Sequence, residues 1–132
     1  MEKKYRITDM TTSLIKYHFV FCPRYRRKIF LVDGVETRFR ELVNFKCEEM
    51  EIEVIDIRCD KDHAYLFLNC PPEYSAYRIM QQLKCYTSTI LLKEFEELSK
   101  MPNLWTKNYF VSTEEMQENE ITIFVERQRK KY

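Results

Sequence analysis

The residues whose types and spacing could do chemistry fall into two basic clusters and two isolated histidines. The first cluster surrounds Tyr25 and consists of Arg24, Arg26, Arg27 and Lys28, while the second closes the chain over residues 127–131. Cationic side chains neutralise phosphates and aromatic rings stack on unpaired bases, so this composition favours a nucleic-acid partner. The plainer alternative is a solvated loop and a helix end whose cations offset the helix dipole.

The two histidines, His18 and His63, do not by themselves indicate a catalytic centre. His63 directly follows the polar turn 60–62, and His18 stands between apolar residues, so a structural role is the default for both. With only two histidines, a zinc site built mainly from histidine is excluded. A single glycine, Gly34, also excludes the glycine-rich loops that bind dinucleotides or phosphates.

The elements that must position these residues can be placed from hydrophobic periodicity and turn signals. Strands are predicted at 14–22, 53–59, 63–70 and 105–111, and the turn at 60–62 makes the middle two a hairpin. A helix is predicted from Val35 to Met50 with Asp33 as its cap, and a second from Ser75 to Leu98. A final helix begins at about Asn119.

This order predicts an α+β fold, a ferredoxin-like split βαβ antiparallel sheet with an added C-terminal helix. The 132 residues form one domain, in which residues 1–12 are predicted to be a flexible arm and residues 114–132 to carry the last helix. The net charge is +1 and no stretch approaches the ~20 apolar residues of a membrane span. Five cysteines without close pairing and no apolar leader favour a soluble protein of the reducing cytoplasm, with no membrane partner.

Four ordered motifs resemble those of the HUH-type single-tyrosine transposases, the small TnpA enzymes of insertion sequences that move as single-stranded DNA. The opening strand and loop are similar in YHFVFCPRYRRKIF, and the hairpin that carries the family's His-hydrophobic-His motif is similar in DIRCDKDHAYLFLNCPPEYS. LWTKNYFVST resembles the strand before the catalytic helix, and FVERQ has the spacing of the family's Tyr-x-x-x-Gln helix. The resemblance covers about residues 13–128, and REP-associated tyrosine transposases are relatives.

The resemblance implies a DNA strand transferase that works through a phosphotyrosine intermediate. In such enzymes a tyrosine hydroxyl attacks a DNA phosphodiester, and two histidines with a glutamine bind magnesium or manganese. The resemblance also implies single-stranded or hairpin DNA as partner, and a homodimer in which two sheets join edge to edge. Here the exposed edge is predicted to include Trp105, Tyr109 and Phe110.

Carried onto this sequence, the family's catalytic set is incomplete. The first metal-ligand histidine is His63, but its partner position holds Tyr65 and the nucleophile position holds Phe124. Gln128 stands at the glutamine position. Phenylalanine has no oxygen to form a phosphodiester, and a phenol with a pKa of about 10 is a poor ligand for a divalent ion.

Three functions therefore remain open at the level of sequence. The first is a transposase-family DNA-binding protein with a degenerate active site and weak or absent metal binding, whose DNA contacts are Arg24, Arg26, Arg27 and Lys28. The second is an active transposase with an unusual constellation, for which Tyr132, one turn beyond Gln128, is a displaced nucleophile. The third is a repurposed protein-interaction module.

Overall fold

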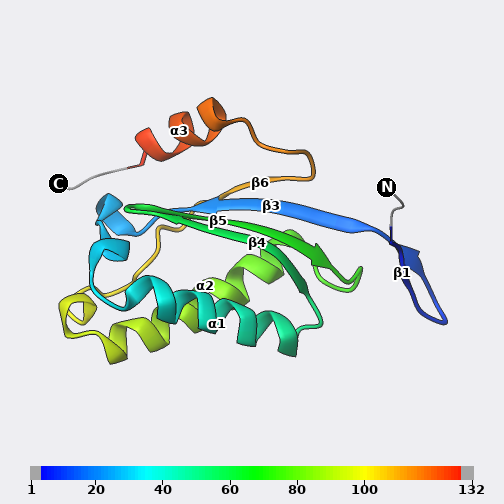
Figure 1. Ribbon diagram of the computed structural model, residues 1–132, viewed down its shortest axis with the longest axis horizontal. Helices are drawn as coiled ribbons and strands as arrows, with labels where there is room; N and C mark the ends of the chain where they lie inside the picture. The colour runs from blue at the N-terminus through cyan, green and yellow to red at the C-terminus, as the bar shows by residue number, and fades with distance from the viewer. Residues whose placement is uncertain (1–3, 129–132) are drawn as a thin grey trace.

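The computed structural model describes residues 4–128, which form a four-stranded antiparallel sheet covered by helices on both faces (Figure 1). The strands lie in the order β4-β5-β3-β6, in which β3 is Ile15–Phe21, β4 is Glu53–Asp60, β5 is His63–Cys70 and β6 is Phe110–Ser112. Two long helices, α1 (Val35–Glu49) and α2 (Ala76–Glu94), pack on one face. A short helix, α3 (Glu118–Glu126), covers the other. The predicted ferredoxin-like arrangement with an added C-terminal helix is confirmed.

Strand alternation divides the apolar residues between these two layers. Phe19 and Phe21 of β3, with Leu66 and Leu68 of β5, are fully buried against α1 and α2. The opposite sides of the same strands form a second, smaller cluster, whose buried members are Val20, Cys22, Tyr65, Met116 and Val125. The main core therefore holds the sheet and long helices together, whereas the smaller cluster attaches α3.

Both predicted long helices are present, but only one has the predicted cap. The Ser75 hydroxyl accepts a hydrogen bond from the Arg78 amide at 3.0 Å, as expected for an N-cap. The cap of α1 is Gly34, in a left-handed conformation (φ 85°), rather than Asp33, and no side chain caps this helix. The helix α2 also ends earlier than predicted, at Glu94, and a 3-10 turn follows at Glu96–Leu98.

The predicted strand 105–111 is mostly an irregular segment, and only Phe110–Ser112 pair with β3. Trp105 forms an isolated bridge with Pro23 and lies in the main core, where its indole N–H donates to Thr87 Oγ1 at 2.9 Å. The prediction of Trp105 on an exposed edge is therefore wrong, because packing and a buried hydrogen bond hold its ring inside. Tyr109 and Phe110 are only half-buried.

The two ends of the described chain also carry local structure. Within the polar N-terminal segment, β1 (Arg6–Ile7) pairs with β2 (Thr12–Ser13) as a small hairpin beyond the end of the main sheet (Figure 1). At the other end, α3 begins at Glu118 with a capping box between Gln117 and Glu120, one residue before the predicted start. None of the helices within residues 4–128 is long and apolar enough to cross a membrane.

Candidate functional site

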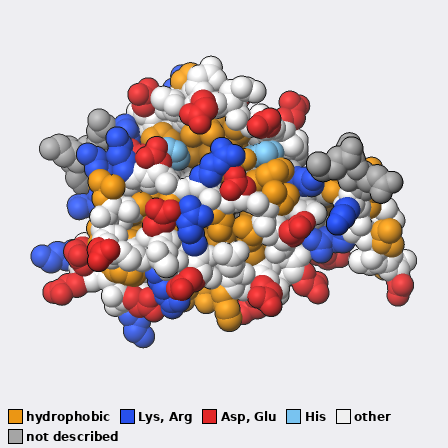
Figure 2. Space-filling view, in the orientation of Figure 1, with side chains coloured by type: hydrophobic (Ala, Val, Ile, Leu, Met, Phe, Trp, Pro, Cys, Tyr) orange, Lys and Arg blue, Asp and Glu red, His pale blue; other side chains and the backbone are white. Residues whose placement is uncertain are grey.

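The candidate site lies on the face of the sheet that α3 covers. The alternation of β5 places His63, Tyr65 and Phe67 on this face, and β3 contributes His18 and Val20. The antiparallel register sets His18 opposite Phe67 and Val20 opposite Tyr65. In Figure 2, histidine side chains are visible in the band between the sheet and α3, among hydrophobic and basic groups. Both sequence-predicted hairpin positions, 63 and 65, therefore share one surface with a histidine from a different strand.

The hydroxyl of Tyr65 is bound to His18. Its oxygen lies 2.7 Å from Nδ1 of His18 in a buried environment, and the His18 imidazole stacks on Phe67 with 4.0 Å between ring centroids. Burial lowers the pKa of His18, against a smaller opposing effect of Glu115. Burial likewise raises the pKa of Tyr65. Both groups are therefore neutral near pH 7, and the phenol and the imidazole share one hydrogen bond whose donor is set by the tautomer of His18.

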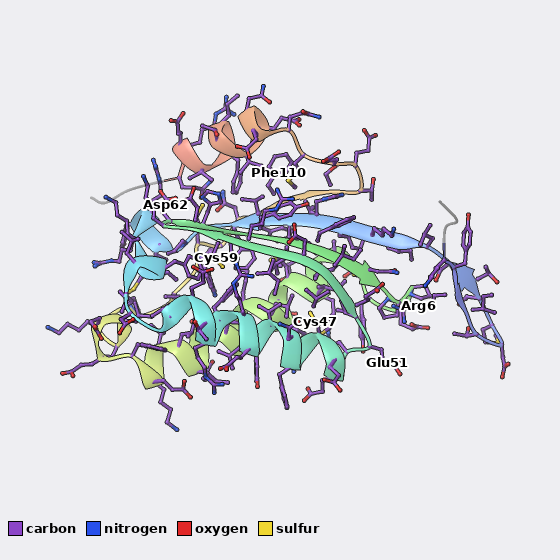
Figure 3. The ribbon with its side chains drawn as sticks, viewed as in Figure 1. Arg6, Cys47, Glu51, Cys59, Asp62 and Phe110 are labelled. Atoms are coloured by element: carbon purple, nitrogen blue, oxygen red, sulfur yellow. The ribbon has the colours of Figure 1, made fainter. Side chains whose placement is uncertain are left out.

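His63 belongs to a second, charged arrangement at the tip of the β4–β5 hairpin. Its Nδ1 lies 3.2 Å from Oδ1 of Asp62, and the other carboxylate oxygen of Asp62 accepts from Arg26 at 3.2 and 3.3 Å. Burial alone would raise the pKa of Asp62, but the hydrogen bonds from His63 and Arg26 outweigh it and lower that pKa. Figure 3 shows Asp62 at this tip, at the same end of the sheet as the basic segment 24–28. Asp62 is thus an ionised bridge between the basic segment and His63.

The four predicted DNA-binding cations do not share one environment. Arg27 and Lys28 are exposed, whereas Arg26 turns inward to Asp62. The guanidinium of Arg24 lies 5.5 Å from the centroid of the Tyr25 ring, so the aromatic residue of the cluster contacts a neighbouring cation. The basic segment therefore presents a mixed surface rather than four equivalent charges.

Phe124 and Gln128 lie close together, although they do not share one helix as predicted. The helix ends at Glu126, and the Gln128 amide nitrogen reaches back to donate to the Phe124 carbonyl oxygen at 3.1 Å. The centroid of the Phe124 ring lies 5.6 Å from that of Phe110, which Figure 3 labels beneath α3. Phe124 also packs on the small cluster that contains Tyr65. Tyr132, the displaced nucleophile of the second hypothesis, lies outside the described residues.

The donors present do not fit a resident magnesium or manganese ion. The Tyr65 hydroxyl is neutral and already bonded to His18, and the amide nitrogen of Gln128 is a donor that cannot ligate a cation. Of the ligand set that the resemblance implies, the described part of the chain therefore offers one imidazole nitrogen of His63 and the amide oxygen of Gln128. Within residues 4–128, no group of three or more His, Cys, Asp or Glu side chains is placed to hold a metal ion.

Two residues of the site were not identified from the sequence. The position of His18 between apolar residues predicts a structural histidine, and it is buried as expected, but its contact with Tyr65 is not predictable from that pattern. The polar turn at 60–62 predicts a solvent-exposed Asp62, yet this residue is 5% exposed and contacts two basic side chains, Arg26 and His63. For Asp62 the sequence does contain a signal, because the family's motif has an acidic residue directly before its first histidine and Asp62 stands at that position. The contact of His18 with Tyr65 depends on the register in which β3 pairs with β5, and a single sequence does not give that register.

Comparisons with known protein sequences relate this chain to transposases. The family model described as "Transposase IS200 like" matches residues 11–128. The transposase for insertion sequence element IS200 of Salmonella typhimurium, and that of Salmonella typhi, are each 32% identical to this chain over 104 residues. That alignment covers 74% of this chain and 66% of each relative, so the matched part spans just under two thirds of the relatives' length.

Solved structures show the same fold. The crystal structure of a candidate transposase from Deinococcus radiodurans R1 superposes with a TM-score of 0.82 at 21% identity, over 94% of this chain and 98% of that one. A REP-associated tyrosine transposase, solved with a REP hairpin bound, gives a TM-score of 0.57 at 12% identity, over 90% of this chain and 64% of that one.

Proposed function

Because this chain belongs to the IS200-like transposase family, we propose that it is a DNA-binding member of that family in which strand cleavage has been lost. The observation that carries the proposal is the side chain of Phe124. It stands at the family's nucleophile position, packs against Phe110 and offers no oxygen to a phosphorus atom. The rest of the site supports the same conclusion, because the Tyr65 hydroxyl is committed to His18.

Single-stranded or hairpin DNA is the proposed ligand. The exposed cations Arg27 and Lys28, together with Arg24, supply phosphate contacts beside the hairpin tip, and Tyr25 adds an aromatic surface. A hairpin is also the DNA form bound in the structure of the REP-associated enzyme, whose fold this chain shares. Binding of this kind needs neither a nucleophile nor a metal ion, so it survives the loss of both.

A homodimer is proposed through β6, the short edge strand. Its outer edge has no partner among residues 4–128, and Val111 is 36% exposed there. Next to it lies an open groove of about 530 Å³ between β6 and α3, where Ile123 is 48% exposed. The opposite edge, β4, is bulged between Val54 and Asp56 and rich in charge, which discourages pairing. The apolar edge is therefore the one suited to a second copy.

The experiment that tests the proposal separates binding from cleavage. Single-stranded DNA taken from the flanks of the encoding locus is titrated with the full chain, and affinity is followed as salt increases. The same mixtures, with manganese present, are then run on a denaturing gel. We expect salt-sensitive binding without a covalent adduct. An adduct from the unaltered chain would refute the loss of catalysis, and mapping it to Tyr132 would establish the displaced nucleophile. Absence of binding would favour the protein-interaction function.

A further inference from the structure

We propose that Arg26 is a positioning residue, which acts through Asp62 to fix the imidazole of His63, and that it is not one of the phosphate contacts. This inference rests on the proposed function, in which the basic segment binds DNA. It separates one arginine from the cluster Arg24, Arg26, Arg27 and Lys28 and assigns it a different task.

The contacts form a continuous chain of three side chains. Arg26 donates from Nε and Nη2 to the same oxygen of Asp62, at 3.3 and 3.2 Å, and His63 Nδ1 lies 3.2 Å from the other oxygen. The side chains of Arg26, Asp62 and His63 are only 15%, 7% and 18% exposed. An ionised carboxylate can only accept, so Nδ1 of His63 must carry the proton. In the neutral form of the ring, Nε2 on the opposite side is then the unprotonated nitrogen.

The backbone of the basic segment is shaped for this contact. Tyr25 and Arg26 both have left-handed backbone conformations, with φ of 60° and 52°, which are unfavourable for residues other than glycine. Backbone hydrogen bonds fix the segment at both ends. The Arg24 amide donates to the Leu104 carbonyl at 2.9 Å, and the Phe30 amide donates to the Lys61 carbonyl at 3.4 Å. This unfavourable conformation directs the Arg26 side chain to the hairpin tip, while Arg27 remains exposed.

The electrostatic consequence is that Arg26 adds little net charge to the DNA surface. Its guanidinium is neutralised by a buried carboxylate, whereas exposed Arg27 can release counterions from a phosphate. Arg27 is therefore the matched control for Arg26 when the salt dependence of DNA binding is measured.

The test uses the full chain, with the variants Arg26→Ala, Arg26→Lys and Arg27→Ala, and two readouts. The first is the tautomer of each histidine, measured by nitrogen-15 NMR at about pH 8, where free imidazole is neutral. In the unaltered chain we expect His63 to be protonated on Nδ1, and the tautomer of His18, which bonds to Tyr65 instead, serves as the internal reference. Arg26→Ala should convert His63 to a tautomer mixture without altering His18. Arg26→Lys should restore the Nδ1 form, and Arg27→Ala should leave it unchanged.

The second readout is the slope of log affinity for single-stranded DNA against log salt. Arg27→Ala should reduce this slope by about 0.7, the value for one phosphate contact on a single strand. Arg26→Ala should change it by less than half as much. If Arg26→Ala does not fold, a fourth variant, Arg26→Gln, decides, because its amide can still donate to Asp62 and keep the Nδ1 form, whereas its loss of charge would reduce the slope by about 0.7 if residue 26 contacted a phosphate.

An unchanged His63 tautomer in Arg26→Ala, or a slope reduced as much as in Arg27→Ala, would overturn the proposal. If the unaltered chain binds no DNA, the proposed function fails, but the tautomer measurement still decides the role of Arg26.

Discussion

Tyr65 and His18 come from neighbouring strands, and their side chains join in a 2.7 Å hydrogen bond beneath α3. Under the proposed function, Tyr65 stands at the position of the family's second metal-ligand histidine, and the His18 ring is stacked on Phe67. The pair is a neutral contact in which each side chain satisfies the other.

This hydrogen bond should contribute measurably to stability. Tyr65→Phe leaves the buried His18 nitrogen without a partner, and we expect the free energy of unfolding to fall by about 1–3 kcal/mol. His18→Phe should cost a similar amount by leaving the Tyr65 hydroxyl unpaired. The double variant should lose less than the sum, because neither polar group then remains buried. Urea denaturation of the four proteins measures this coupling.

Tyr17→Phe provides the matched control, since Tyr17 lies on the main-core side of β3. It should change the free energy of unfolding by less than about 0.5 kcal/mol. Strict additivity of the His18 and Tyr65 variants would show that the two side chains do not interact in solution.

Restoring catalysis should require changes at two positions. Phe124→Tyr returns a hydroxyl to the nucleophile position, but leaves Tyr65 bonded to His18. Tyr65→His breaks that bond and supplies the second histidine that the family uses. We expect no adduct with flank-derived single-stranded DNA and manganese from either single variant, and an adduct from the double variant, because the groups act on one phosphate. A comparable adduct from Phe124→Tyr alone would show that residue 65 is not limiting.

Charge placed on the β6 edge should dissociate the proposed dimer. Val111→Lys puts an ammonium on the exposed outer strand, where edge pairing would have to bury or oppose it. We expect light scattering after gel filtration to show a dimer for the unaltered chain and a monomer for the variant. The control is Ile55→Lys on β4, where Ile55 is 41% exposed at the opposite edge. Dissociation by Ile55→Lys instead would place the interface on β4.

Lys84 should make stability rise with pH in the alkaline range. Burial lowers its pKa to about 8, and its ammonium donates to the carbonyls of Thr106 and Lys107. The folded pKa lies below the unfolded value of 10.5, so the unfolded chain binds more protons between these values. The destabilisation is fully present below pH 8 and disappears as pH rises toward 10.5.

The variant Lys84→Met cannot titrate at this position and isolates the effect. Between pH 7.5 and 10, we expect the free energy of unfolding of the unaltered chain to rise by about 1–2 kcal/mol relative to that of the variant. This energy is smaller than the full pKa shift would give, because solvent screens the partly exposed ammonium. Denaturant unfolding at several pH values measures the difference, and parallel profiles for the two proteins would contradict the prediction.

The positions of helices and strands could be predicted from the sequence more fully than the side-chain contacts between them. Alternation in β5 and the Ser75 cap are local properties, and both were placed correctly. The extent of β6 depended on whether Trp105 packs into the core, which is decided by its contact with Thr87 far along α2. The family resemblance predicts roles for His63, Tyr65, Phe124 and Gln128, but the contacts of these residues depend on strand register and loop conformation. For that reason His18 and the inward turn of Arg26 became visible only in three dimensions.

The division of β5 between two layers has a consequence for how such a protein can change over evolutionary time. Ala64, Leu66, Leu68 and Cys70 face the main core and determine whether the sheet forms. His63 and Tyr65 face the other way, toward a helix held by a small cluster. A mutation on that side can remove the chemistry while the main core, and with it most of the folding energy, is left intact. Such a chain can lose its reaction in single steps without passing through an unfolded ancestor, and its scaffold stays available for a new task.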